Sequence, residues 1–283
     1  MRSTITRKLQ SIKTYLYPLY WQAARLGWRL LPIKKAPEIR NHQYTIGITT
    51  YLDRYETLFK PFLLQLLKLF PETEIVITVN GHYNRTSQLL YLENIRSFLK
   101  QFPNVKVITF VEAKGLSKLW NLLLLNSSNE RLFILNDDLE ISPLFRRDLE
   151  KSGILSEKIA LVNQSWSHFM ISREMVNLVG WFDERFPAIG NEDEDYESRL
   201  VLKQVEMGFF HFRSIKAILT IPVTYSYGEQ VDIINTKYLK ANKVFFDTKW
   251  ETVTQPTAGY HYVRILNAWV KLKEGMDTPR FYS

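Results

Sequence analysis

The chain has 283 residues, 46% of them hydrophobic and 14% aromatic, with 37 basic and 29 acidic side chains and a net charge of +8. This length suits one large domain or two small ones, and the apolar content excludes a disordered, collagen-like or purely coiled-coil chain. Cysteine is absent, which excludes disulfides and thiolate metal sites. The apolar runs are too short to predict a transmembrane span, and we expect no signal peptide.

The excess positive charge lies in the first 35 residues, which contain eight basic side chains and no acid. The remaining 248 residues carry 29 charges of each sign. A nucleic-acid-binding domain needs a basic face on its body, so nucleic acid is not an expected partner.

The segment over residues 1–31 has helical periodicity. Its apolar positions recur at steps of three and four residues and are Ile5, Leu9, Ile12, Leu16, Leu19, Ala23, Leu26 and Leu30. A basic, acid-free amphipathic helix with Trp and Tyr is typical of a helix that lies on anionic lipid. This predicts a cytoplasmic protein, peripheral at the inner face of the membrane. Docking on the chain's own body or on a second subunit, and a disordered tail, stay open.

From residue 44 onward, apolar strands alternate with amphipathic helices. We expect strands over 44–49, 74–79, 105–111 and 131–135, and helices over 58–70, 87–101 and 116–126. This order predicts an α/β fold with a mostly parallel sheet flanked by helices. Ligands of such sheets bind beyond the carboxyl ends of the strands, here at 49–54, 80–85, 114–117 and 136–138.

After residue 140 the pattern is less regular. We expect a helix after Pro143, strands over 159–163 and 167–171, a helix over 192–206, and strands over 209–213 and 217–223. The last forty residues are interpreted as mixed helix and loop.

Asn136, Asp137 and Asp138 directly follow an apolar strand. Because side chains alternate in extended backbone, residues 136 and 138 should face one way and residue 137 the other. Two oxygen-bearing groups at the ligand edge of a sheet suit Mg²⁺ or Mn²⁺, which would neutralise a diphosphate. The alternative is an Asx turn at the end of the strand.

A second acidic segment covers residues 190–199. Asn191 and Glu194 can form a capping box, and Asp195 can pair with Arg199 one helical turn later. Glu192 and Asp193 then lack an obligatory structural partner. Carboxylates at a helix N-terminus are expected to stay ionised, which is the state that a general base needs. A purely structural role for the whole segment remains the alternative.

Six short segments form an ordered set along residues 44–199. They are Thr50-Tyr51 to Arg54, Asn80-Gly81, Gly115-Leu116-Ser117 with Asn121, Leu135 to Asp138, Val179 to Phe186, and Glu192 to Asp195 with Arg199. Together these segments resemble inverting GT-A-fold glycosyltransferases of the family-two type.

The resemblance implies a role for each matched position. The nucleotide would be bound by Thr49, Thr50, Tyr51, Arg54, Asn80, Gly115, Ser117, Lys118 and Asp137. A divalent cation, Mn²⁺ or Mg²⁺, would be held by Asp138 and Asn136. Asp193, beside Glu192, would be the base toward the acceptor hydroxyl. Aromatic side chains could also stack on the sugar and acceptor, with Trp166 and Trp181 as candidates and His168 as a polar contact. A core role for Trp181 and a structural role for His168 stay open.

The function implied is transfer of a sugar from a nucleoside-diphosphate donor to a saccharide or lipid-linked acceptor, in the assembly of a surface polysaccharide or glycoconjugate. Residues 1–40 would be a basic helical segment and linker, 41–140 the donor-binding half, and 141–283 the acceptor-binding and catalytic half with C-terminal helices. A homo-oligomer is compatible with this organisation.

Two alternatives remain. A nucleotidyltransferase would need a glycine-rich loop after the first strand, whereas residues 49–54 contain no glycine. A catalytically silent binding scaffold is kept open by Asn136, which stands where the resembling enzymes have an aspartate.

Overall fold

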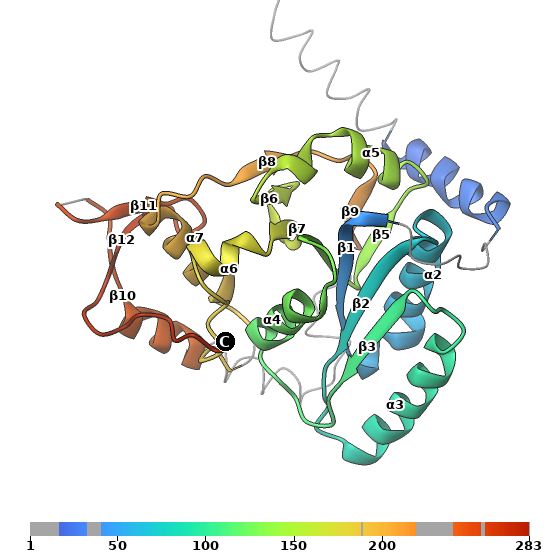
Figure 1. Cartoon of the computed structure of the whole chain (residues 1–283), viewed down its shortest axis with the longest axis horizontal. Helices are drawn as coiled ribbons and strands as arrows, with labels where there is room; N and C mark the ends of the chain where they lie inside the picture. Colours follow the sequence, from blue (N-terminus) through green and yellow to red (C-terminus); the bar gives the residue numbers. More distant parts are fainter. Residues whose placement is uncertain (1–16, 33–40, 188, 219–239, 256–257, 283) are drawn as a thin grey trace, which may run out of the picture.

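The computed structural model describes residues 17–32, 41–187, 189–218, 240–255 and 258–282. Its centre is a seven-stranded sheet with helices on both faces (Figure 1). The strands in spatial order are β3 (Val105–Thr109), β2 (Thr73–Val79), β1 (Asn41–Thr50), β4 (Arg131–Asn136), β7 (Ser165–Ser172), β6 (Ile159–Val162) and β8 (Gly208–Phe210).

The predicted α/β fold with a mostly parallel sheet is confirmed. Strand β1 lies between β2 and β4, and both pairs are parallel, as is the pair of β2 with β3. Strand β7 enters between β4 and β6 and is antiparallel to both. All seven residues of β2 are buried, because a central parallel strand is covered on both faces.

The helices divide between the two faces of the sheet. Phe133 and Leu135 of β4 pack into one apolar cluster, and Leu132 and Ile134 pack into the other. The helices of the first cluster are α2 (Lys60–Leu69), α3 (Arg85–Leu99) and α5 (Phe145–Lys151). Those of the second are α4 (Leu116–Asn126), α6 (Glu174–Leu178) and α7 (Glu192–Leu202).

Several element boundaries differ from the predictions. A single π-helical turn, Tyr55–Phe59, precedes α2. Helix α7 ends at Leu202, four residues early, and the left-handed backbone of Gln204 (φ 54°) follows it. Strand β9 (Ile215–Ala217) pairs with β5 (Leu139–Ile141), whereas most of the predicted strand 217–223 lies outside the described residues.

The C-terminal prediction of mixed helix and loop is wrong in part. A helix over 240–249 is followed by an antiparallel sheet of β10 (Trp250–Val253), β12 (Ala268–Leu272) and β11 (His261–Val263). This part lies away from β1–β3 in Figure 1 and has its own small core. Strands of three to five residues are too short to show the alternation that predicts them.

The N-terminal helix, described over residues 17–30, docks on the body beside α5 and β5 (Figure 1). Trp28 Nε1 donates a hydrogen bond to the Ile141 carbonyl at 2.9 Å, and Arg25 pairs with Glu140 at 2.7 Å. The docking alternative is therefore correct for this part, while residues 1–16 of the predicted helix lie outside the described residues. None of the described helices is both long and apolar enough to cross a membrane.

Candidate functional site

The loops after β1 and β4 meet because these strands are parallel neighbours, with Thr49 opposite Asn136. Arg54 Nη1 lies 2.7 Å from Asp137 Oδ1 and 3.0 Å from Asp138 Oδ2. Arg54 Nε also donates a hydrogen bond to the Tyr51 hydroxyl at 2.7 Å. One guanidinium reaches both carboxylates because β4 ends at Asn136 and the chain bends there, so the predicted strand alternation does not extend to residue 138.

The two carboxylates differ in their surroundings. Asp137 is buried, and burial raises its pKa to about 6, although Arg54 and the Thr50 hydroxyl favour its charged form. The Asp138 side chain is 21% exposed. Asp138 is thus the carboxylate that a ligand can reach, whereas the buried Asp137 holds the Arg54 guanidinium in place through its ion pair.

The end of β4 fits a divalent cation. Asn136 Oδ1 is buried and has no hydrogen-bond partner among the described residues. Amide and carboxylate oxygens such as those of Asn136 and Asp138 are the ligands that Mg²⁺ and Mn²⁺ prefer. In the part of the chain that the structure describes, no group of three or more His, Cys, Asp or Glu side chains gathers for a metal. A divalent cation at this position would need further oxygen ligands from a bound substrate such as a diphosphate.

Asn80 ties three loops together at this edge of the sheet. Its side-chain amide donates to the Lys114 carbonyl at 3.0 Å and accepts from the Lys114 N–H at 2.8 Å. Its own N–H donates to the Thr50 carbonyl at 2.8 Å. The next residue, Gly81, has to be a glycine, because a Cβ at this position would overlap the backbone of Glu112. The predicted nucleotide contact of Asn80 stays a prediction, while its amide shapes the loops around the site.

The first turn of α4 contacts the loop over residues 180–186. A Cβ on Gly115 would lie 2.5 Å from the Phe186 carbonyl oxygen, so only glycine allows this approach. Ser117 is buried, and Lys118 Nζ donates to Glu184 at 2.9 Å. Lys118 is therefore already paired with an acid. If its ammonium contacts a diphosphate, it does so while it is also paired with Glu184.

The three residues predicted to contact the sugar are buried. Trp166 packs against Phe169, with ring centroids 5.0 Å apart, and Trp181 packs against Tyr282, also at 5.0 Å. His168 lies in β7, and burial lowers its pKa to about 4, so it is neutral at pH 7. Their roles toward a sugar stay predictions, and the contacts of Trp166 and Trp181 are those of core packing.

Helix α7 begins with a run of carboxylates, most of which have fixed structural partners. The predicted pair of Asp195 with Arg199 is confirmed at 2.9 Å. The predicted capping box is wrong: Asn191 has a left-handed backbone (φ 68°), and its side chain contacts the Glu194 carboxylate rather than a backbone N–H. Further along, Glu197 pairs with Arg264 at 3.1 Å. Glu192 and Asp193 remain, neither of them with an ion-pair partner among the described residues.

These two neighbouring carboxylates carry raised pKa values. Glu192 is 4% exposed, and burial together with the charge of Asp193 raises its pKa to about 8. Burial also raises the pKa of Asp193, against the stabilising N–H of Glu194. Burial thus favours the neutral form of Glu192, against the expectation that both carboxylates stay ionised. Asp193 is thus the carboxylate of the pair better suited to accept a proton.

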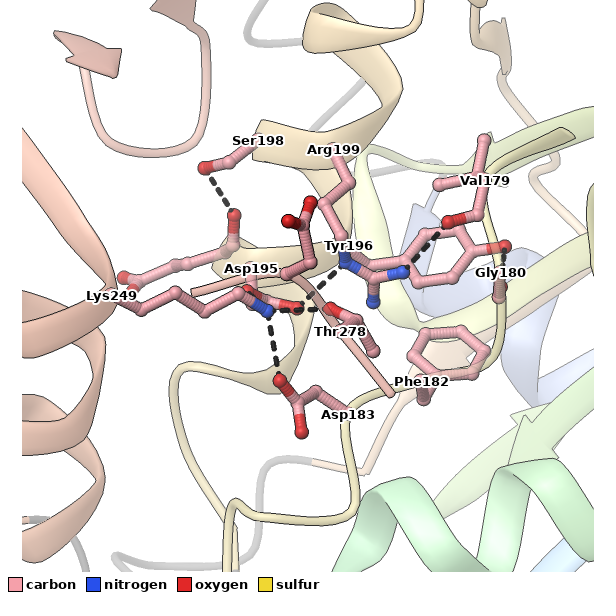
Figure 2. Close-up of polar contacts among 12 residues, drawn as sticks. Val179, Gly180, Phe182, Asp183, Asp195, Tyr196, Ser198, Arg199, Lys249 and Thr278 are labelled. Atoms are coloured by element: carbon pink, nitrogen blue, oxygen red, sulfur yellow. Dashed lines mark hydrogen bonds and ion pairs between the residues drawn. The ribbon is translucent and has the colours of Figure 1, made fainter. Parts of the chain in front are cut away.

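A buried lysine joins α7 to the C-terminal part of the chain (Figure 2). Lys249 Nζ lies 2.6 Å from Asp195, 2.8 Å from Asp183 and 2.7 Å from Thr278 Oγ1. Lys249 and both carboxylates are fully buried. Despite burial, Arg185 and Lys249 hold the pKa of Asp183 at about 2. Sequence reasoning missed Lys249, which lies in a segment without a readable pattern, although its partners Asp183 and Asp195 both belong to recognised motifs.

Comparison with known proteins identifies a fold. No protein-family model and no curated protein matches this chain. Among solved structures, the mannosyltransferase PcManGT from Pyrobaculum calidifontis, in complex with GDP-Man and Mn²⁺, is 12% identical with a TM-score of 0.53, and the match covers 88% of this chain and 76% of that chain.

Two further matches have lower TM-scores. S. aureus TarS 1–349 is 16% identical with a TM-score of 0.43, over 59% of this chain and 57% of that chain. GalNAc-T7 with UDP, GalNAc and Mn²⁺ is 11% identical with a TM-score of 0.46, over 71% of this chain and 50% of that chain. On the match to PcManGT, the chain has the mixed α/β fold of GT-A-type glycosyltransferases, with a large, mostly parallel central sheet.

Proposed function

We propose that this protein is an inverting glycosyltransferase, which transfers a sugar from a nucleoside-diphosphate donor to a saccharide or lipid-linked acceptor in surface polysaccharide or glycoconjugate assembly. The fold that it shares with PcManGT, which was solved with GDP-Man and Mn²⁺, supports a sugar-nucleotide donor. The observation that carries the proposal is the pair Glu192 and Asp193, the carboxylates of α7 that no side chain among the described residues pairs with or hydrogen-bonds.

The donor side of the proposed site is the cluster around Arg54. Its guanidinium, fixed by Tyr51 and Asp137, lies at the carboxyl ends of β1 and β4, where ligands of such sheets bind. Asn136 and Asp138 would hold a divalent cation, which when bound would offset the charge of the diphosphate. Arg54 adds a positive charge beside the same carboxylates and would stabilise the leaving diphosphate.

The acceptor side of the proposed site is the start of α7. The acceptor oxygen attacks the anomeric carbon as the bond from that carbon to the diphosphate oxygen breaks, so the configuration inverts. The hydroxyl proton passes to the Asp193 carboxylate, and the electron pair leaves with the diphosphate. Burial raises the pKa of Asp193 above its ordinary value, which strengthens it as a base, while Glu192 stays protonated at neutral pH.

The proposal is tested by Asp193→Asn. Removal of a general base costs about 10²–10⁴-fold in kcat, and donor binding should be unchanged because the base faces the acceptor. Glu194→Gln is the matched control, since the Glu194 carboxylate is already engaged by Asn191. Transfer is followed by release of the nucleoside diphosphate. Wild-type turnover by Asp193→Asn would refute the assignment of the base.

A catalytically silent scaffold makes a different prediction. It would bind a sugar nucleotide at the Arg54 cluster but release no nucleoside diphosphate with any acceptor. Asn136 is the observation that favours this second candidate. It stands where the resembling enzymes have an aspartate, so the proposed cation site has one negative charge fewer.

A further inference from the structure

The helix over residues 17–30 has two opposite apolar faces. At 3.6 residues per turn, successive side chains are about 100° apart around the helix axis. The inner face is buried against the body and consists of Trp21, Ala24 and Trp28. The outer face, about 180° away, is a stripe at steps of four, three and four residues, formed by Leu19, Ala23, Leu26 and Leu30. We call these four residues the outer stripe.

The outer stripe is open to solvent in the described structure. Leu19 is 58% exposed, Leu26 60% and Leu30 84%, and Ala23 is exposed as well. A helix that only covers its own domain presents polar residues on its outer side. Aligned leucines on both faces therefore indicate that the outer stripe has an occupant of its own.

The charge of the segment identifies the kind of occupant. Exposed Arg29 lies beside the stripe, about 60° from Leu26 around the axis. The sequence before the helix adds Arg2, Arg7, Lys8 and Lys13, and residues 1–35 contain no acid. Repeated positive charge without acids complements a negatively charged surface, whereas the buried core of a protein–protein interface is depleted of charge.

We infer that the outer stripe inserts into an anionic lipid surface while the inner face stays docked on the body. An amphipathic helix in this position lies in the plane of the membrane, with its apolar side at the boundary between headgroups and acyl chains. Docking and membrane binding are then properties of two faces of one helix. The contacts of Trp28 and Arg25 with Ile141 and Glu140 fix the orientation of the body on that surface.

Sedimentation of the full chain with vesicles tests this inference. The vesicles are phosphatidylcholine alone or phosphatidylcholine with phosphatidylglycerol. The wild type should bind the anionic vesicles, and less so as salt rises. The double substitution Leu26→Glu with Leu30→Glu should weaken binding at least about tenfold, because each leucine loses its transfer into an apolar environment.

The matched control is Leu89→Glu with Leu90→Glu, which changes two leucines of α3 that are 49% and 60% exposed. It should bind vesicles like the wild type, and the thermal unfolding of both variants should match that of the wild type. A chain shortened to begin at residue 36 is a poorer test, because it also removes Trp28 from the core.

Three outcomes would overturn the inference. The wild type could fail to bind either kind of vesicle, or the outer-stripe variant could bind as well as the wild type. Light scattering could instead show a dimer that the outer-stripe variant dissociates, without vesicle binding, which would assign the stripe to a second copy of this chain. The test does not depend on sugar transfer, so its result is separate from that of the proposed function.

Discussion

Glu192 and Asp193 are adjacent in sequence, and burial raises the pKa of both carboxyls. Burial and the charge of Asp193 raise the pKa of Glu192 to about 8, so Glu192 is a neutral acid at pH 7. Asp193 accepts the N–H of Glu194 at 3.0 Å, which favours its charged form. This buried pair can therefore hold a single negative charge, as the proposed role of Asp193 as a base requires.

The raised pKa of Glu192 predicts how folding stability depends on pH. In the unfolded chain Glu192 ionises near pH 4.5, whereas in the folded protein it ionises near 8. The stability that its neutral form contributes is therefore fully present below about pH 4.5 and is lost as the pH rises through 8. The loss has a slope of up to about 1.4 kcal/mol per pH unit.

Urea unfolding at pH 6, 7 and 8 checks this prediction. The free energy of unfolding of Glu192→Gln should fall less with pH than that of the wild type, since glutamine does not titrate. The difference between the two proteins cancels the other groups that titrate over this range. Parallel pH dependences would contradict the assignment of a neutral Glu192.

At the scale of elements, α7 is held from the C-terminal side by Lys249 at the end of helix 240–249. The same ammonium contacts Asp183 of the loop before α7, so three segments meet at one buried charge (Figure 2). This anchoring sets where the first turn of α7, with Asp193, is presented. In the proposed reaction Lys249 would act by positioning α7 rather than by contacting the substrate.

Lys249→Met should destabilise the fold by about 3 kcal/mol, the lower end for a broken buried ion pair. The lower end applies because Arg185 and Arg199 still contact the two carboxylates. Denaturant unfolding measures the loss.

The control for this substitution is Lys243→Met on the same helix. Lys243 pairs with Asp247, but its side chain is 60% exposed. Lys243→Met should therefore lower the free energy of unfolding by less than about 1 kcal/mol. Equal losses for the two variants would show that Lys249 does not anchor α7.

The elements around the donor side of the site could be predicted from the sequence. Apolar runs such as those of β1 and β4 indicate buried strands. The alternation of strands and helices predicts a parallel sheet, and therefore which loops lie at the same edge of it. The segments 49–54 and 136–138 were accordingly predicted to be neighbours. Their detailed contacts could not be predicted, because the bend after Asn136 turns Asp137 and Asp138 toward the same guanidinium.

The anchoring of α7 could not be predicted in the same way. A buried lysine such as Lys249 has no signal in a hydrophobic pattern, and its partners lie 54 and 66 residues away in sequence. The raised pKa of Glu192 likewise depends on burial that only the packed structure reveals. Local patterns thus predicted the elements, whereas the charges between distant segments required the fold.

At the scale of the whole molecule, the N-terminal helix and the C-terminal sheet both pack against the domain of the central sheet (Figure 1). The helix over 17–30 packs on the face that carries α5. Trp250 of the C-terminal sheet shares a small core with Phe186 of the loop before α7 and with Leu202 at the end of α7. The carboxyl ends of β1 and β4 carry the proposed donor site, with Arg54 at its centre. The lipid-facing surface and the site of transfer that we propose therefore belong to one fold, which would suit a lipid-linked acceptor.

The central claim is sugar transfer, and its most direct test is a panel of nucleoside-diphosphate sugars, each with Mn²⁺, with Mg²⁺ and without either cation. Thermal unfolding measures binding, and release of the nucleoside diphosphate measures turnover. We expect one donor to raise the melting temperature of the wild type and to be converted to its nucleoside diphosphate. Asp193→Asn should keep the first effect and lose the second. If no donor stabilises the protein and none is turned over, with or without a cation, the protein is not a sugar transferase of this kind.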